Sequence, residues 1–130
     1  MPADVEWKNT NPIIHYGEVV NYEIISTICD RMVRHDLFEQ MKYQIHDFTK
    51  TKKSILNSFE IDVISARDIY INTWNEGLYV ILACNTKEMT EHALLYKEFM
   101  QELAWKVNIV DTIEEAYALA EEYEAVYAKQ

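Results

Sequence analysis

The feature that most constrains the fold is an unbroken apolar run, Leu78-Tyr-Val-Ile-Leu-Ala-Cys84, bounded by Gly77 and Asn85. The run shows no alternation of apolar and polar side chains. A strand of this kind is buried on both faces, which is typical of a central strand in a parallel sheet covered by helices. It is also far shorter than the stretch of about 20 apolar residues that a membrane-spanning helix needs. The sequence therefore predicts an α/β fold.

The rest of the chain alternates between strand-like and helix-like segments. Two short β-prone runs are joined by a polar turn and predict a hairpin, and each later strand is followed by a helix with a capping residue at its start. The expected elements are strands at Val5–Trp7, Ile13–Tyr16, Tyr43–Asp47, Leu78–Cys84 and Lys106–Val110, and helices that begin at Asn21, Asn57, Asn85–Thr86 and Thr112.

The resulting order is ββαβαβαβα, which predicts a mixed, mostly parallel sheet of about five strands with helices packed on it. With 130 residues and no linker-like segment, the chain is expected to form one domain over residues 1–130. The first helix should end near Arg34–Asp36. We expect the hairpin strand Val5–Trp7 to lie at the edge of the sheet.

Helical spacing predicts which side chains face the core. The expected core positions are Tyr22, Ile25, Ile28/Cys29 and Met32/Val33 in the first helix, Phe59, Val63, Ala66 and Tyr70 in the second, His92, Leu95/Tyr96, Phe99 and Leu103 in the third, and Ile113, Ala116/Tyr117, Ala120, Tyr123 and Tyr127 in the last.

Polar residues follow three of the expected strands. They are Asp47 and Thr49, Asn85 and Thr86, and Asp111 with the threonine after it. Ligands of open α/β sheets bind beyond the carboxyl ends of the parallel strands, so these residues could form a shallow polar pocket or a rim that faces a partner. They could equally serve to satisfy backbone amides of loops and helix starts.

The charge balance argues against nucleic acid as a partner. The formal net charge is −10, from 22 acidic and 12 basic residues, and such a field repels a phosphate backbone. The one basic cluster is Lys50, Lys52 and Lys53 in the segment after the second predicted strand. We interpret this cluster as part of a solvated loop, and the alternative is that the three lysines bind a phosphate group.

The sequence carries no recognisable catalytic or metal-binding motif. Gly17 and Gly77 are the only glycines, so a phosphate-binding glycine loop cannot be built. His46, Asp47 and Cys84 are the best candidates for an enzyme or metal site, because both strands would deliver them near their carboxyl ends. Nothing in their spacing requires such a site, and we predict no metal, no cofactor and no catalytic residue.

The remaining composition points to a cytoplasmic protein. No hydrophobic segment follows Met1, and the two cysteines, Cys29 and Cys84, lie in apolar surroundings without zinc spacing. We therefore expect two reduced, buried thiols in a protein that is not embedded in a membrane.

The layout resembles the SpoIIAA-like family, which is related to STAS domains (sulfate transporter and anti-sigma factor antagonist). The resemblance spans nearly the whole chain and is carried by Ile13–Glu18, the strand that ends in Asp47-Phe-Thr49, the run Leu78–Cys84, and Asn108–Tyr117. It implies a mixed sheet with helices and no particular reaction. Anti-sigma factor antagonists are phosphorylated on a serine at the start of a helix, and the resemblance makes Ser58 the matching candidate.

These observations leave three functional hypotheses. The first is a non-enzymatic regulatory or protein-interaction module of STAS-like fold, with homodimerisation expected because edge strands and surface aromatics need covering. The second is a carrier of a small apolar molecule or lipid, with a cavity of roughly a few hundred Å³ lined by Tyr70, Trp74, Phe48 and Met89. The third is an enzyme that uses His46, Asp47 and Cys84.

Overall fold

The computed structural model describes residues 3–101 and 105–128. It contains a five-stranded sheet in the order β1-β2-β4-β6-β7, in which β1 is antiparallel to β2 and all other neighbours are parallel. The strands are β1 (Ala3–Lys8), β2 (Asn11–Tyr16), β4 (Tyr43–Asp47), β6 (Tyr79–Ala83) and β7 (Lys106–Val110). The α/β prediction is confirmed, and β1 lies at an edge as expected.

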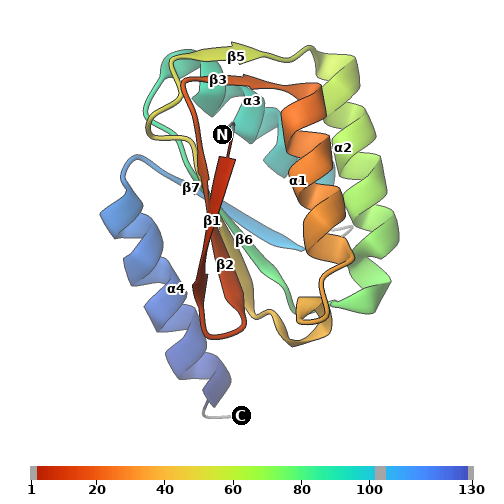
Figure 1. The fold of residues 1–130 in the computed structure, drawn as a ribbon, viewed down its shortest axis with the longest axis vertical. Coiled ribbons are helices and arrows are strands. Elements are labelled where there is room, and N and C mark those ends of the chain that lie inside the picture. Colours follow the sequence, from red (N-terminus) through yellow and green to blue (C-terminus); the bar gives the residue numbers. More distant parts are fainter. Residues whose placement is uncertain (1–2, 102–104, 129–130) are drawn as a thin grey trace.

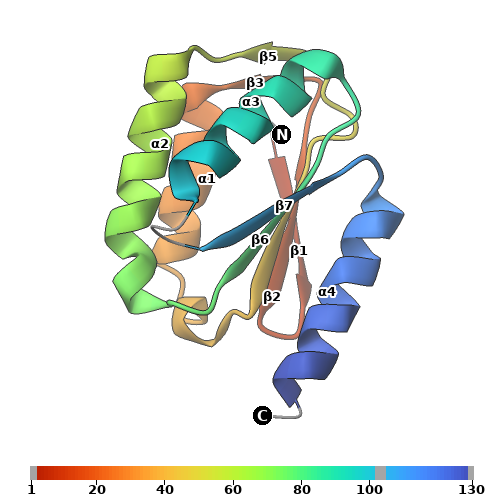
Figure 2. The same cartoon turned by 180° about the vertical axis from the view of Figure 1, so that it is seen from behind.

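Helices cover both faces of this sheet. The helices α1 (Tyr22–Val33), α2 (Ser58–Ile71) and α3 (Lys87–Met100) pack on one face, and α4 (Ile113–Ala128) packs alone on the other (Figures 1 and 2). Two short 3₁₀ helices, η1 (Phe38–Gln40) and η2 (Asn72–Trp74), follow α1 and α2. The order of the long elements is therefore ββαβαβαβα, as the sequence predicts.

The central strand β6 explains the two-layer core. All five of its residues are buried. Val80 and Leu82 belong to the cluster beneath α1, α2 and α3, whereas Ile81 and Ala83 belong to the cluster beneath α4. Because helices cover both faces of the sheet at this strand, side chains on both faces of β6 must be apolar, and its sequence shows no alternation.

The sequence analysis did not predict a second, two-stranded sheet. Strand β3 (Val19–Asn21) pairs in parallel with β5 (Lys53–Ile55) at the carboxyl edge of the main sheet. The backbone amides of Lys52 and Lys53 both donate to the carbonyl of Glu18, at 2.8 and 3.0 Å. The lysine segment is therefore not a free loop but is fixed to the β2–α1 connection.

The predicted core face of α2 is wrong. Phe59 and Tyr70 are 73% and 72% exposed, and the buried residues are instead Ile61, Ser65, Asp68 and Ile71. The helix carries apolar residues around most of its circumference, so spacing alone does not single out one face. Ser65 on the buried face has a hydrogen-bond partner within the helix, because its hydroxyl donates to the Ile61 carbonyl at 2.8 Å.

The other helices follow the prediction more closely. In α1, Asn21 caps the helix by accepting from the Ile24 amide at 2.8 Å, and Ile25, Ile28 and Met32 are buried. In α4, Ala116 and Ala120 are buried, and Tyr127 has no described side chain. The buried residues of α3 are Met89, Ala93 and Met100. This buried face lies next to the predicted face of His92, Leu95/Tyr96 and Phe99. The last predicted position, Leu103, lies outside the described residues. None of the described helices is long and apolar enough to cross a membrane.

Candidate functional site

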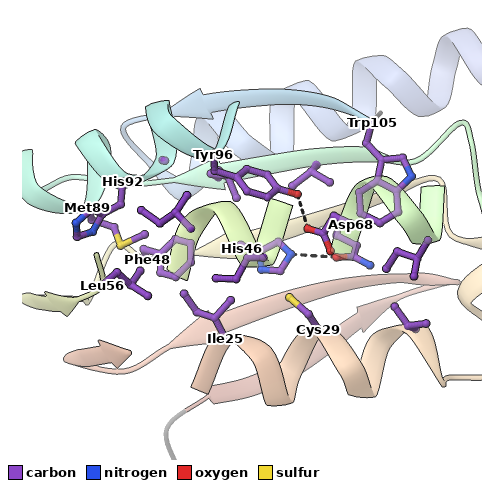
Figure 3. A pocket seen from close by; sticks show the side chains of 18 of the residues that line it. Ile25, Cys29, His46, Phe48, Leu56, Asp68, Met89, His92, Tyr96 and Trp105 are labelled. Atoms are coloured by element: carbon purple, nitrogen blue, oxygen red, sulfur yellow. Dashed lines mark hydrogen bonds between the residues drawn. The ribbon is translucent and has the colours of Figure 1, made fainter. Parts of the chain in front are cut away.

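A cavity of about 70 Å³ lies between the sheet and the three helices α1, α2 and α3. Its walls are mostly apolar and include Ile25 of α1, Val80 and Leu82 of β6, and Met89 and Ala93 of α3. Trp105 and Asp68 lie at one end of the cavity, and Met89 and His92 lie at the other (Figure 3). We call this cavity the helix-side pocket.

Among the described residues, Asp68 is the one acidic side chain that lines the helix-side pocket. It is only 5% exposed, and its Oδ2 atom accepts a hydrogen bond of 2.6 Å from the Tyr96 hydroxyl. Burial raises the pKa of this carboxyl from 3.8 to about 6, although the Tyr96 hydroxyl and the charge of Arg67 act in the opposite direction.

The second oxygen of Asp68 faces accessible space. No described residue donates a hydrogen bond to Oδ1, and every fully buried side-chain polar atom among the described residues has a partner. It follows that Oδ1 is not sealed in the core but remains open to a small molecule. Figure 3 shows the carboxyl beside Tyr96 at the pocket wall.

A chain of buried polar groups runs along the sheet side of the pocket. The Tyr16 hydroxyl donates to His46 Nδ1 at 2.9 Å, and His46 Nε2 donates to the amide oxygen of Gln44 at 3.0 Å. Burial lowers the pKa of His46 to about 4, so its ring is neutral at pH 7. Because each group here has a partner, this chain acts as a structural support of the pocket.

A separate polar cluster lies on the α4 face of the sheet, near the carboxyl ends of β2 and β4. His15 Nδ1 is 2.7 Å from Asp47 Oδ2, and His15 Nε2 is 3.0 Å from Glu6 Oε1. Burial lowers the pKa of His15, but its hydrogen bonds with Glu6 and Asp47 outweigh that effect and raise the pKa above 6.5. The imidazole therefore favours its charged form between two carboxylates.

The sequence analysis missed the pairing of His15 with Asp47. The two residues are direct register partners in the parallel β2–β4 pair, so their side chains lie next to each other on one face. Burial raises the pKa of Asp47, but hydrogen bonds from Thr49 and His15 outweigh burial and lower it. The register of the two strands is the signal that could have revealed this pair.

The predicted rim is only partly assembled. Thr49, Asn85 and Thr86 line an open cleft of about 410 Å³ together with Lys50, Lys52 and the segment Gly17–Glu18, and neither Asp47 nor Asp111 is part of that lining. The Asn85 amide donates to the Thr49 carbonyl at 2.8 Å, and Thr86 caps α3 by accepting from the Met89 amide at 3.2 Å.

Local hydrogen bonds thus account for much of the rim. Asp47 Oδ1 likewise accepts from the Thr49 amide and hydroxyl, at 2.9 and 2.6 Å. The ammonium group of Lys52 is 3.7 Å from the Glu18 carboxylate, so this lysine is already partnered in the cleft. These contacts favour the interpretation that the rim residues fix loops and helix starts.

The three candidate residues for an enzyme do not converge. His46 and Cys84 belong to the face beneath α1–α3, whereas Asp47 points to the α4 face. Burial, together with the charges of Asp47 and Asp111, raises the pKa of Cys84 to about 12, so the thiol is protonated at pH 7. In the part of the chain that the structure describes, no group of three or more His, Cys, Asp or Glu residues could hold a metal ion.

The outer surface of α2 carries a row of exposed apolar side chains. Phe59, Val63, Ala66 and Tyr70 are exposed along one side of the helix, and the Tyr70 ring meets the exposed Trp74 ring edge-on at 6.1 Å between centroids. We call these five residues the α2 stripe. Four of them, Phe59, Val63, Ala66 and Tyr70, were predicted to face the core. Tyr70 and Trp74 were expected to line a ligand cavity. The structure places all five on the outer surface.

Ser58 is the first residue of α2 and is exposed. The expected helix start at Asn57 is confirmed and forms a capping box, since the Asn57 side chain accepts from the Glu60 amide at 2.8 Å and the Glu60 side chain accepts from the Asn57 amide at 3.1 Å. Ser58 therefore lies on the surface beside one end of the α2 stripe.

Comparisons of the chain with protein-family models, with curated proteins and with solved structures found no match. The fold defines the class as a small α/β protein with a five-stranded mixed sheet.

Proposed function

We propose that the chain is a protein-interaction module of STAS-like fold that self-associates through the α2 stripe. The observation that carries the proposal is the exposure of an apolar and aromatic row on α2, at positions where a helix of a monomeric protein normally presents polar residues. The occupant of this surface is a second copy of the chain.

The spacing of the stripe fits a helix as its partner. Phe59, Val63, Ala66 and Tyr70 follow one another at steps of four, three and four residues. This is the alternation of a seam along which two helices pack with side chains interlocked. The small Ala66 and the medium-sized Val63 stand at the centre of the row, where two helices approach most closely.

The order of side chains favours an antiparallel pair with two-fold symmetry. In that arrangement Phe59 of one copy meets Tyr70 of the other, and Val63 meets Ala66, so that each bulky end covers the opposite bulky end. Glu60 and Arg67 lie on one flank of the stripe by helical geometry. Antiparallel pairing brings Glu60 of each copy towards Arg67 of the other, but Arg67 already pairs with Asp30 of α1 at 3.5 Å, so the proposed contact rests on the apolar stripe.

The test is the mass of the particle in solution over a range of concentrations, measured by sedimentation equilibrium. Wild type should populate a dimer, and the double variant Phe59→Glu/Tyr70→Glu should be a monomer. The matched control is Leu94→Glu/Val126→Glu, because both residues are exposed apolar side chains outside α2, each 53% exposed; this variant should remain dimeric. A monomeric wild type, or a dimer that survives the α2 substitutions, refutes the proposal.

A regulatory role for Ser58 is part of this proposal. A phosphate there would add negative charge beside Phe59 and close to the carboxylate of Glu60, at the edge of the α2 stripe. We expect Ser58→Glu to weaken self-association while Ser58→Ala leaves it unchanged, as read from the dissociation constant in the same sedimentation experiment. Equal constants for the two variants would rule out control at this position.

The carrier hypothesis is the second candidate and is supported by the helix-side pocket alone. Phe48 and Met89 line that pocket as expected, but Tyr70 and Trp74 do not. The volume of about 70 Å³ is below the few hundred Å³ that a lipid requires. A carrier role is therefore restricted to a ligand of a few heavy atoms.

A further inference from the structure

We propose that the helix-side pocket binds a small alkyl amine, whose ammonium group pairs with the free oxygen of Asp68. The site is built from a carboxyl that is 5% exposed, one of whose oxygens is held by Tyr96 while the other accepts no hydrogen bond from the described residues. This binding site is independent of the self-association proposed for α2.

Asp68 is poorly explained as a structural residue. The other polar side chains at the pocket, such as His46 and Gln44, are hydrogen-bonded to protein partners at each ring nitrogen or amide group. A carboxylate buried with one hydrogen bond destabilises the fold, and an asparagine or an apolar residue at this position of α2 would avoid that effect. Buried ionisable groups that face a cavity with an unsatisfied atom are typical of binding sites.

The surroundings of Asp68 call for a cation. The titratable or charged groups that face it are Cys29 from α1, Arg67 from α2 itself, Tyr96 from α3 and Tyr16 from β2. Burial is the largest factor that raises the pKa of Cys29, Tyr16 and Tyr96, so these three groups are neutral at pH 7.

Arg67 does not supply the missing charge inside the pocket. Its guanidinium donates to the Ser26 carbonyl at 3.2 Å and lies 3.5 Å from Asp30 Oδ1, both on α1. Arg67 is also not among the residues that line the cavity. Asp68 therefore faces the pocket without a counter-ion of its own, and an ammonium group would provide one together with a donor for Oδ1.

The rest of the pocket selects the size and polarity of the ligand. Trp105 donates its indole N–H to the Asn75 carbonyl at 2.7 Å, and it lies with Tyr96 at the Asp68 end of the pocket (Figure 3). Aromatic rings next to a cation add to its stabilisation. Beyond this end the walls are Ile25, Leu82 and Met89, and the volume of about 70 Å³ suits an alkyl chain of about two carbons, because a cavity of about twice that volume is needed for a ligand of six heavy atoms.

The experiment is an NMR titration of the intact protein with ethylamine at pH 7.5, in phosphate buffer and with the methyl groups of Ile25 and Met89 as reporters. We expect saturable shifts of these two signals. Ethanol at the same concentrations is the neutral ligand of matched length, and it should bind at least tenfold more weakly. The methyl groups of the exposed Leu94 and Val126 report any nonspecific effect.

Two variants complete the test. Asp68→Asn keeps the shape of the side chain but removes its charge, and it should weaken ethylamine binding at least tenfold. Ala93→Leu fills the pocket from α3 and leaves the carboxyl of Asp68 in place, and it should abolish binding. The proposal is overturned if ethylamine produces no saturable shift in wild type, if ethanol binds equally well, or if either variant binds ethylamine like wild type.

Discussion

Replacing Asp68 with asparagine should stabilise the protein at neutral pH and leave its stability nearly unchanged at pH 4. The carboxyl is protonated at pH 4 in most folded molecules, because burial raises its pKa from 3.8 to about 6. As the pH rises, the unfolded chain ionises first and the folded state must then bury a charge. The contribution of Asp68 to the stability of the folded state is therefore most favourable below about pH 4, where the carboxyl is protonated. This contribution is lost as the pH rises through 6.

The magnitude follows from the size of this shift. The pKa rises from 3.8 to about 6, and each unit corresponds to about 1.4 kcal/mol of unfolding free energy, so the ionised carboxyl destabilises the folded state by about 3 kcal/mol at pH 7.5. The asparagine has no such effect and can still accept from the Tyr96 hydroxyl. The unfolding free energy of Asp68→Asn minus that of wild type should therefore grow from about 0 at pH 4 to about 3 kcal/mol at pH 7.5.

The difference between the two proteins must be measured, since the pH profile of wild type alone is misleading. Burial lowers the pKa of His46 from 6.5 to about 4, so the neutral ring stabilises the fold above pH 6.5 and this contribution is lost as the pH falls towards 4. The effects of His46 and Asp68 have opposite signs over the same range and nearly cancel in wild type. The difference between variant and wild type removes the contribution of His46.

The assay is urea unfolding followed by tryptophan fluorescence at five pH values from 4 to 7.5, at one protein concentration and in buffers without amines. Asp62→Asn is the control, because it is the same substitution at an exposed aspartate of the same helix; the stabilisation that Asp68→Asn gains with pH should exceed that of this control. A difference for Asp68→Asn that is constant between pH 4 and 7.5, or that favours wild type at pH 7.5, refutes the reasoning about this carboxyl.

Three further substitutions test other contacts. Tyr96→Phe removes the only described hydrogen bond to Asp68, so it should destabilise the fold by about 1–3 kcal/mol at pH 7.5 and by less at pH 4, as measured by the same urea titrations. His15→Gln should destabilise more at pH 5 than at pH 8, by about 1 kcal/mol or less because the His15 side chain is 30% exposed and its ion pairs are partly screened by solvent. The raised pKa of His15 means that its contribution to stability is present below pH 6.5 and is lost as the pH rises above the pKa of the folded state. Asn57→Ala removes the capping box with Glu60 and should lower the unfolding free energy by about 1 kcal/mol at any pH from 6 to 8, whereas a loss below 0.2 kcal/mol would show that the cap is dispensable.

The sequence predicted those elements whose local pattern of apolar residues is clear. In α1 and α4 the apolar residues gather on one side, and the buried positions Ile25, Ile28, Ala116 and Ala120 were among those expected. The unbroken run of β6 identified the central strand. In these segments hydrophobic spacing and tertiary burial agree, so local pattern is sufficient.

Prediction failed where burial depends on contacts between distant segments. The apolar residues of α2 surround the helix, and its buried face includes Asp68, whose partner Tyr96 lies 28 residues further along the chain. The strands β3 and β5 have three residues each, which is too short for a period to be recognised.

The same limit applies to the candidate site. Asp47 was identified at the end of its strand, but its contact with His15 depends on the register of a parallel pair that no local pattern specifies. Asp68 carries no sequence signal at all, because an aspartate within a helix is normally a solvated residue. The pocket emerges only from the packing of three helices on the sheet.

The measurement that most directly tests self-association through the α2 stripe is disulfide formation between single-cysteine variants. Phe59→Cys and Tyr70→Cys chains are mixed under mild oxidation, with Cys29 and Cys84 left in place because burial raises the pKa of both thiols and slows their reaction. The account predicts a rapid disulfide between Cys at 59 in one chain and Cys at 70 in the other, and little dimer from either variant alone. Dimers formed by each variant alone, or no disulfide in the mixture, would contradict an antiparallel contact between two α2 helices.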